Sequence, residues 1–260
     1  MGLEMHALST EMEHVAAWEE RLRPRLTQVR ERIAQAAERA HRSPESITLV
    51  AVTKGHPPEA VVAAWRLGVR DFGENRVEEG EEKIPRVHAL LTTLVGEVPP
   101  EEMPRWHMIG HIQSRKAARA VSPYVLVHSV DRLKIARRLD RFAGERDIVL
   151  PVLLEVNVSG EESKYGFHPE DVFSAVEEIL ALSHLRVEGL MTMAPFVADP
   201  EETRPVFRQL RRLRDALHAR YPDVSWHHLS MGMSNDFEVA IEEGATIVRI
   251  GTAIFGPREA

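Results

Sequence analysis

The sequence predicts an α/β protein, a single (β/α)8 TIM barrel with an additional N-terminal helix. Three observations predict it. Apolar runs of strand length alternate with amphipathic helical stretches. The alternation occurs eight times, and 260 residues is close to the ~250 typical of one such barrel. A doubly wound open sheet is the alternative arrangement of the same units. No linker divides the chain, so we expect one domain over 1–260, with a helical extension at 1–44 and the barrel at 45–256.

The first expected element is a helix in the N-terminal extension. Thr10 and Glu13 have the pattern of a capping box, which marks the start of a helix. An apolar stripe of helical spacing follows, made of Leu22, Leu26, Val29, Ile33, Ala36 and Ala40. Because a proline kinks a helix or begins a new one, we expect a bend or restart at Pro24.

Eight apolar runs supply the expected strands. They are 47–53, 69–72, 106–109, 125–130, 148–158, 187–190, 226–229 and 246–250. Helix-start residues such as Asp131 and Ser234 follow most of the runs, and Gly244 has the position of a helix C-cap. Residues 206–217 have the helical period, whereas 91–102, with two adjacent prolines, are expected to form a loop.

Composition excludes several classes of protein. The chain has no cysteine, which excludes disulfides, thiolate metal sites and cysteine nucleophiles. Its net charge of −7 argues against nucleic acid or an anionic membrane as partner. No apolar stretch approaches the ~18 residues of a membrane span. The first twenty residues carry five glutamates and no apolar signal core, so we expect a cytoplasmic protein.

Lysine is scarce, and one lysine has an unusual position. Of the 33 basic residues, 28 are arginine, and the five lysines are Lys54, Lys83, Lys116, Lys134 and Lys164. Lys54 alone ends an apolar run, at the close of the first expected strand. A desolvated lysine can lose its proton and act as a nucleophile, whereas arginine stays charged. A lysine that only extends its amine to solvent from a strand end fits the pattern equally well.

The carboxyl ends of barrel strands carry the active face, and here those ends suit an anionic ligand. Glycine and hydroxyl residues follow the last two strands, at Ser230-Met231-Gly232 and Gly251-Thr252, where backbone N–H groups can bind a phosphate. Ordinary turns with helix caps are the alternative, with Ser234 as an N-cap. Arg249 is the only charged residue of its strand. Inside the barrel it requires a ligand ring nitrogen or a carboxylate, and outside it would pair with an acid on a helix.

Thirteen histidines raise the question of a metal site. His107 and His111 are four residues apart, and His227 and His228 are adjacent. The first pair spans a strand end and a turn, and no third ligand is placed with either pair. We therefore expect no metal.

The sequence resembles the YggS/PROSC family of pyridoxal-phosphate homeostasis proteins in seven segments, which include Lys54 and the ends of the last two strands. The matching segments run in order from residue 49 to 256, nearly the whole chain. They are LVAVTKGHPPEAV (49–61), DFGENRVEE (71–79), WHMIGHIQSRKA (106–117), VHSVDR (127–132), NVSGEESKYGF (157–167), GLMTMAPF (189–196) and LSMGMSNDFEVAIEEGATIVRIGTAIFG (229–256).

The resemblance implies a fold-type III barrel, similar to the N-terminal domain of alanine racemase, with pyridoxal 5′-phosphate (PLP) held by Lys54 as an internal aldimine. Ser230, Gly251 and Thr252 match phosphate-binding positions, and Arg249 matches the arginine near the pyridine nitrogen. Asn75 and His107 fall in segments that line the pocket. The chain departs from the family at three places. His56 stands where a second lysine is common, and Arg76 and Arg115 replace a tyrosine and an asparagine, so contacts made by those residues are not expected here.

The residues favour a carrier over an enzyme. Racemisation needs acid and base groups on both faces of the cofactor. Lys54 serves one face, and the resemblance implies that a tyrosine of a second domain, which we do not expect here, serves the other. Of Tyr124, Tyr165 and Tyr221, we place only Tyr165 near the mouth. An arginine at the ring nitrogen also leaves that nitrogen unprotonated and weakens the ring as an electron sink.

We therefore expect a protein that holds PLP and delivers it to apo-enzymes, keeping amino- and keto-acid pools balanced with little or no turnover. Apo-enzymes that use PLP are the expected protein partners, and the chain is expected to be a monomer or a weak dimer. A PLP-dependent amino-acid racemase is the rival hypothesis. A barrel that binds phosphosugars without a cofactor is a third.

Overall fold

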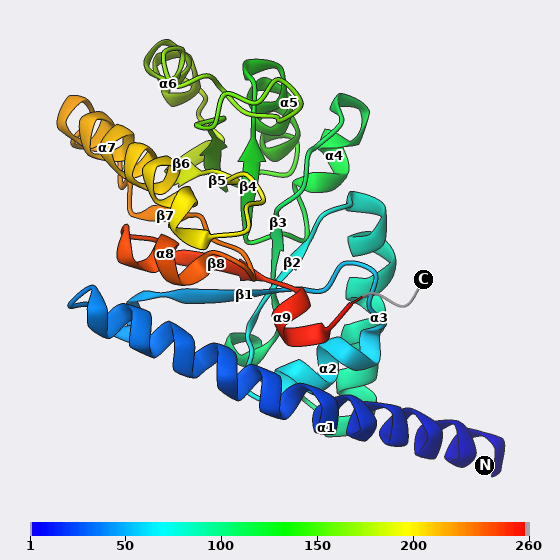
Figure 1. The fold of residues 1–260 in the computed structure, drawn as a ribbon. Helices are drawn as coiled ribbons and strands as arrows, with labels where there is room; N and C mark the ends of the chain where they lie inside the picture. The colour runs from blue at the N-terminus through cyan, green and yellow to red at the C-terminus, as the bar shows by residue number, and fades with distance from the viewer. Residues whose placement is uncertain (1, 258–260) are drawn as a thin grey trace.

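The computed structural model describes residues 2–257, with side chains from residue 9 onward, and contains a closed barrel of eight parallel strands (Figure 1). The strands follow the order of the sequence, and β1 pairs with β8 in the register Thr48–Ile247 to Ala51–Ile250. The strands are β1 (Thr48–Val52), β2 (Asp71–Glu74), β3 (Arg105–Met108), β4 (Leu126–Val130), β5 (Leu150–Glu155), β6 (Leu185–Met191), β7 (His228–Ser230) and β8 (Ile247–Ile250). This closure confirms the predicted barrel and excludes the open sheet.

Helices cover the outside of the barrel and join successive strands. The α-helices are α1 (Gly2–Arg39), α2 (Pro58–Arg66), α3 (Val77–Val95), α4 (Ala117–Ala120), α5 (Leu133–Gly144), α6 (Val172–Leu180), α7 (Arg204–Arg220), α8 (Phe237–Glu242) and α9 (Thr252–Phe255). Short 3-10 turns are η1 (Pro44–Ser46), η2 (Pro100–Glu102), η3 (Ser114–Lys116) and η4 (Pro200–Thr203). The expected loop at 91–102 is partly wrong, because α3 continues to Val95 with Leu91 buried on its inner face.

Helix α1 lies along one side of the barrel and contacts α2, α8 and α9 (Figure 1). It runs without interruption from Gly2 to Arg39, so the predicted start at Thr10 and the predicted restart at Pro24 are wrong. The apolar stripe continues on both sides of the proline, with Val15, Leu22 and Leu26 all buried. Packing of one continuous face outweighs the roughly 3 kcal/mol that a proline costs inside a helix.

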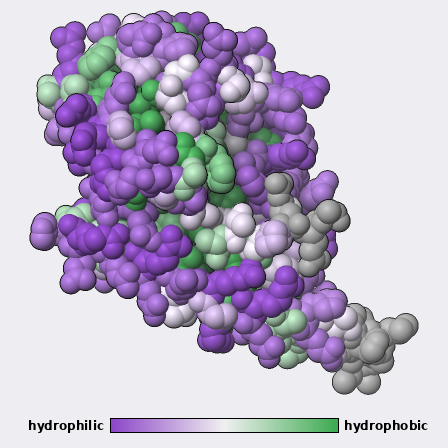
Figure 2. Space-filling view, viewed as in Figure 1, coloured by the Kyte–Doolittle hydropathy of each residue, from purple (hydrophilic) through white to green (hydrophobic). Residues whose placement is uncertain are grey.

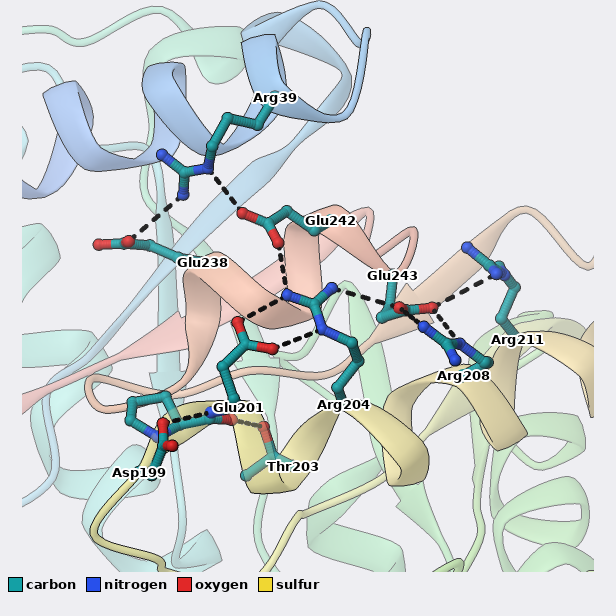
Figure 3. Close-up of polar contacts among 11 residues, drawn as sticks. Arg39, Asp199, Glu201, Thr203, Arg204, Arg208, Arg211, Glu238, Glu242 and Glu243 are labelled. Carbon is teal, nitrogen blue, oxygen red and sulfur yellow. Dashed lines mark hydrogen bonds and ion pairs between the residues drawn. The ribbon is translucent and has the colours of Figure 1, made fainter.

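Ion pairs fasten α1, α7 and α8 to one another on the surface (Figure 3). Arg39 binds Glu238 and Glu242, while Arg204 binds Glu201 from η4 together with Glu242 and Glu243. Arg208 and Arg211 also contact Glu243. The arginine-rich α7 therefore presents an ion-paired face, as expected for a partly solvated helix. The guanidinium groups of Arg204, Arg208 and Arg211 are paired with carboxylates.

Strand alternation decides which side chains enter the barrel. Val50, Leu126, Leu153, Met191 and Ile247 form a small apolar cluster separate from the main core. Successive side chains of a strand point to opposite faces, so residues two further along share the inward face. This places Arg249 of β8 and Glu155 of β5 inward, above Ile247 and Leu153. Lys54 continues the inward series Val50, Val52 just past the end of β1.

Candidate functional site

A pocket of about 240 Å³ opens at the carboxyl ends of the strands. Its exposed lining surface is mainly apolar and also includes several polar and charged side chains, as in small-molecule sites. The lining residues are Val52, Lys54, Asn75, Ile109, Met193, Pro195, Phe196, Met233, Ser234, Asn235, Asp236, Arg249, Gly251 and Thr252. Phe196 is 89% exposed at the rim. Figure 2 shows apolar side chains gathered near the middle of an otherwise largely hydrophilic face.

Five of the seven sequence-predicted site residues lie together in this pocket: Lys54, Asn75, Arg249, Gly251 and Thr252. His107 and Ser230 do not line it. Both are buried inside the barrel, where each contacts His128. Whatever these two residues contribute to the site is therefore transmitted through other side chains.

The backbone on each side of Lys54 is held by a buried cluster of charges. Lys83 Nζ lies 2.7 Å from the carbonyl oxygen of Thr53, from Glu74 Oε1 and from Glu79 Oε1. The same Glu79 oxygen accepts a hydrogen bond from the backbone N–H of Gly55. The residues before and after Lys54 are thus joined to α3, which restricts the position of the Lys54 backbone from which the side chain extends.

Sequence reasoning missed this cluster because Lys83 follows the acidic segment 78–82, which contains four glutamates, and therefore resembles a surface residue. In the fold the Lys83 side chain is 6% exposed, and Glu74 is fully buried. Burial raises the pKa of Glu74, although Lys83 and the Thr53 hydroxyl oppose the shift. A buried carboxylate of this kind depends on its cationic partner for stability.

Asn75 presents a polar atom that lacks a partner within the described protein. Its side-chain Oδ1 is buried without a hydrogen bond, and Asn75 lines the pocket. The backbone of Asn75 is packed closely against Gly110: a Cβ added to Gly110 falls 2.6 Å from the Asn75 carbonyl carbon and closer still to its oxygen. Glycine at position 110 therefore allows β3 to approach the chain that carries Asn75. An unpaired buried oxygen facing a cavity suits a ligand that donates a hydrogen bond.

Arg249 forms part of the pocket wall from inside the barrel. Its Nη1 donates to Ser230 Oγ and its Nη2 donates to the carbonyl oxygen of Thr192 at 2.9 Å. Burial lowers the pKa of Arg249 to about 10, while Glu155 and Asp236 oppose the shift, so the group remains charged at neutral pH. The alternative in which Arg249 faces a helix is wrong. Its acceptors are a hydroxyl and a carbonyl, which leave further N–H groups for a ligand.

Ser234 and Asp236 line the pocket and were not among the predicted site residues. Ser234 Oγ accepts a hydrogen bond from the backbone N–H of Ala253 at 3.1 Å, linking the β7–α8 loop to α9. The expected N-cap role of Ser234 is wrong, because α8 begins at Phe237 and the Asp236 carboxylate accepts from the N–H of Met233 at 2.7 Å. Gly244 does end α8, with φ of +105° and a bond from Ala245 N–H to Ala240 O. The hydroxyl nearest the pocket after β7 is thus Ser234, whereas Ser230 lies below it.

Tyr165 lies outside the pocket lining. Its ring stacks on His111 with centroids 3.6 Å apart, and the tyrosine is 52% exposed. Tyr124 is buried over Gly80, and burial raises its pKa. Of the described residues that line the pocket, none is a tyrosine. Across residues 2–257, no three metal-ligating side chains gather at one point. No described helix is both long and apolar enough to cross a membrane.

Glu155 is a buried acid that the sequence pattern did not single out. Burial, reinforced by repulsion from Asp131, raises its pKa from 4.5 to about 7, although Arg249 and Arg132 lower it. The folded protein therefore holds this proton more tightly than the unfolded chain. The resulting stabilisation is complete below about pH 4.5 and is lost as the pH rises to about 7.

Glu155→Gln is expected to stabilise the protein above neutral pH, because it removes a carboxylate that is ionised while buried. The expected gain in the free energy of unfolding relative to wild type is up to about 3 kcal/mol at pH 8, falling towards zero at pH 4.5. Urea unfolding of both proteins at the two pH values measures it. Exposed Glu162→Gln is the control. An equal difference at both pH values would contradict the assignment.

Comparison with known proteins agrees with this geometry. The family model of the alanine racemase N-terminal domain matches residues 25–259. A pyridoxal phosphate homeostasis protein of Aquifex aeolicus is 44% identical over 235 residues, covering 90% of this chain and 97% of the relative. The chain belongs to this family.

Two further relatives extend the match. The pyridoxal phosphate homeostasis protein of Escherichia coli K12 is 40% identical over 237 residues, covering 90% of this chain and 95% of the relative. The structure of PipY from Synechococcus elongatus PCC7942 with PLP bound has a TM-score of 0.72 and 37% identity. It covers 86% of this chain and 100% of PipY. The family resemblance inferred from the motifs is confirmed, and the PipY structure has a similar fold.

Proposed function

We propose that this protein holds PLP covalently on Lys54 and serves PLP homeostasis by storing and releasing the cofactor, with little or no turnover. The observation that carries the proposal is the pocket itself: it is lined by both a lysine and an arginine that is built into the barrel wall. Relatives named as pyridoxal phosphate homeostasis proteins, and the PLP-bound PipY structure, support the same reading.

The residues present fit PLP. The buried Asn75 oxygen without a partner and the charged Arg249 both offer polar contacts that the protein leaves unused. When bound, PLP supplies an aldehyde that reacts reversibly with amines. Lys54 provides the amine, Arg249 a donor for the pyridine nitrogen, and Gly251 and Thr252 backbone and hydroxyl groups for the phosphate. Ser234 lines the pocket and takes the phosphate-binding role that the resemblance gave to Ser230.

The pocket favours a carrier over a racemase. Proton exchange on both faces of the cofactor needs two suitably placed bases. Lys54 is one, but no tyrosine lines the described pocket, and Tyr165 is stacked against His111 at its periphery. A donor from Arg249 to the ring nitrogen also weakens the ring as an electron sink. We propose apo-enzymes that use PLP as the recipients, in the cytoplasm, with the carrier a monomer or a weak dimer.

Borohydride trapping tests where the cofactor is held. Purified protein incubated with PLP is expected to gain visible absorbance, and reduction followed by peptide mapping is expected to label Lys54. Lys54→Ala is expected to lose the label and the absorbance together, since the amine is the only covalent link. Lys134→Ala, at an exposed lysine, is the matched control. A label on another lysine, or the same absorbance in Lys54→Ala, would refute the assignment.

Optical rotation separates the carrier from the racemase. The loaded protein is expected to leave L-alanine and L-serine unchanged and to restore activity to an apo-enzyme that uses PLP. Sustained racemisation that disappears in Lys54→Ala would overturn the carrier proposal. If no absorbance forms even after incubation with PLP, a barrel for other phosphorylated ligands is the better reading.

A further inference from the structure

A continuous line of hydrogen-bonded side chains crosses the barrel beneath the pocket. It begins at Arg249, whose guanidinium contacts Ser230 Oγ. Ser230 Oγ is 2.8 Å from His128 Nδ1, His128 Nε2 is 3.0 Å from His107 Nδ1, and His107 Nε2 is 3.0 Å from Asp71 Oδ1. The line ends at Arg105, which forms a bidentate pair with the Asp71 carboxylate. Arg105 Nε donates to Oδ1 at 2.9 Å and Arg105 Nη2 donates to Oδ2 at 2.6 Å.

The line is shielded from water along its length. Ser230 and His128 are fully buried, and His107, Arg249 and Asp71 are nearly so. Only its last member, Arg105, reaches solvent, at the amino-terminal side of the barrel, where its side chain is half exposed. Five strands contribute the buried members, so the line exists only when the barrel is closed. Polar networks buried in this way are stable only when every donor and acceptor is matched.

Its two ends determine the direction of every hydrogen bond between them. Arg249 can only donate. Asp71 can only accept, because hydrogen bonds from His107 and Arg105 outweigh the opposing effect of burial and lower its pKa. Burial, reinforced by repulsion from the Arg249 charge, lowers the pKa of His128 well below 6.5 and keeps it neutral.

With His128 neutral, one arrangement satisfies all the contacts. The Ser230 hydroxyl accepts from Arg249 and donates to His128 Nδ1. His128 Nε2–H then donates to His107 Nδ1, and His107 Nε2–H donates to Asp71. In the opposite direction Ser230 Oγ would accept from both Arg249 and His128, and its own hydrogen would have no acceptor in the line. Both histidines are therefore Nε2–H tautomers, and the Ser230 lone pairs are turned towards Arg249.

We infer that Asp71, acting through His107, His128 and Ser230, is a positioning group that sets the orientation of the Arg249 guanidinium at the pocket, and with it the affinity for a pyridine ring. The inference rests on the proposed function for its ligand. It assigns a role to His107 and Ser230. The sequence associated both residues with the cofactor, but in the fold neither residue lines the pocket. None of the four residues lines the pocket. Their effect is on the direction in which Arg249 presents its remaining N–H groups.

Nitrogen NMR of the ring-labelled protein without cofactor tests the tautomers directly. His107 and His128 are expected to show a protonated Nε2 and an unprotonated Nδ1, and His107→Gln identifies one of the two signals by its loss. A protonated Nδ1 on His128 would overturn the inference. Because no cofactor is present, this result is independent of whether the protein binds PLP.

A matched pair of variants tests the consequence for the pocket. Gln at position 107 keeps one acceptor for His128 and one donor for Asp71, whereas Leu keeps neither. Pyridoxine 5′-phosphate, which lacks the aldehyde, reports the non-covalent affinity. His107→Leu is expected to bind it roughly tenfold more weakly than wild type, and His107→Gln within about threefold.

Circular dichroism of each variant establishes that it is folded before binding is measured. A folded His107→Leu with wild-type affinity, or a His107→Gln as weak as the Leu variant, would contradict the inference. Wild-type protein that binds neither pyridoxine 5′-phosphate nor PLP would instead refute the proposed function. If His107→Leu does not fold, the comparison of His107→Gln with wild type and the tautomer measurement still decide the question.

Discussion

Lys83→Met is expected to lower the free energy of unfolding by about 3–5 kcal/mol at pH 8, because it leaves a buried carboxylate without its cation. Glu74 is fully buried and relies on Lys83 for its charge partner. The loss should shrink at lower pH, where Glu74, whose pKa burial already raises, takes up a proton and no longer needs the cation. Urea unfolding as a function of pH measures the effect. The same change frees the Thr53 carbonyl beside Lys54, so retention of PLP should fall as well.

The double variant Lys83→Met with Glu74→Gln distinguishes charge from packing. It removes the uncompensated carboxylate, so it should recover most of the lost stability at pH 8. It should not recover the retention of PLP to the same degree, because the contact with Thr53 is still missing. Lys134→Met, at an exposed lysine, is expected to change the stability little. Equal losses in the single and double variants would show that the charge pairing of Glu74 is not the cause.

Gly110→Ala is expected to destabilise the protein by about 1–3 kcal/mol or more and to weaken PLP retention. The added methyl group meets the backbone of Asn75, which cannot move aside as a side-chain end can. Relief of the clash must displace either the end of β3 or the segment that carries Asn75 into the pocket. Thermal unfolding and the dissociation rate of PLP measure the two effects.

Gly73→Ala is the matched control for this prediction. Gly73 is also buried, in the neighbouring strand β2, but a Cβ there meets the side chains of Ile109 and Val50, with closest approaches of 2.8 and 3.0 Å. Those side chains can adjust, so the effect on stability and on cofactor retention should be smaller than for Gly110→Ala. The reverse order would mean that the approach of β3 to Asn75 does not limit the site.

The barrel could be predicted because its evidence is local. Each of the eight apolar runs contains or overlaps an observed strand, since a buried parallel strand requires a short apolar run whatever its neighbours are. Predicted bounds were less accurate; β2, for example, lies at 71–74 and not 69–72. The N-terminal helix was predicted, but its start and the effect of Pro24 were not. Both depend on the surfaces of α2, α8 and α9, against which its apolar stripe packs.

The residues of the site also fall into two groups, those that local sequence reveals and those that only the fold reveals. Lys54 stands out in the sequence because a charge ends an apolar run, and Arg249 because it interrupts one. Glu155 interrupts the apolar run 148–158 in the same way, so the sequence held a signal for it that was overlooked. Lys83 carries no such signal, since it follows an acidic helical segment and resembles a solvated residue. The contacts of His128 with His107 and Ser230 span 21 and 102 residues of sequence.

The sequence by itself therefore determined the fold class, the family and the single lysine on which the proposed function depends, because periodicity and motif are properties of adjacent residues. The tertiary structure decided that Lys83 supports Lys54 and that Ser234 reaches the pocket while Ser230 does not. It also decided that two histidines connect Asp71 to Arg249. The physical reason is that barrel closure sets the register between strands, and register determines which inward side chains meet.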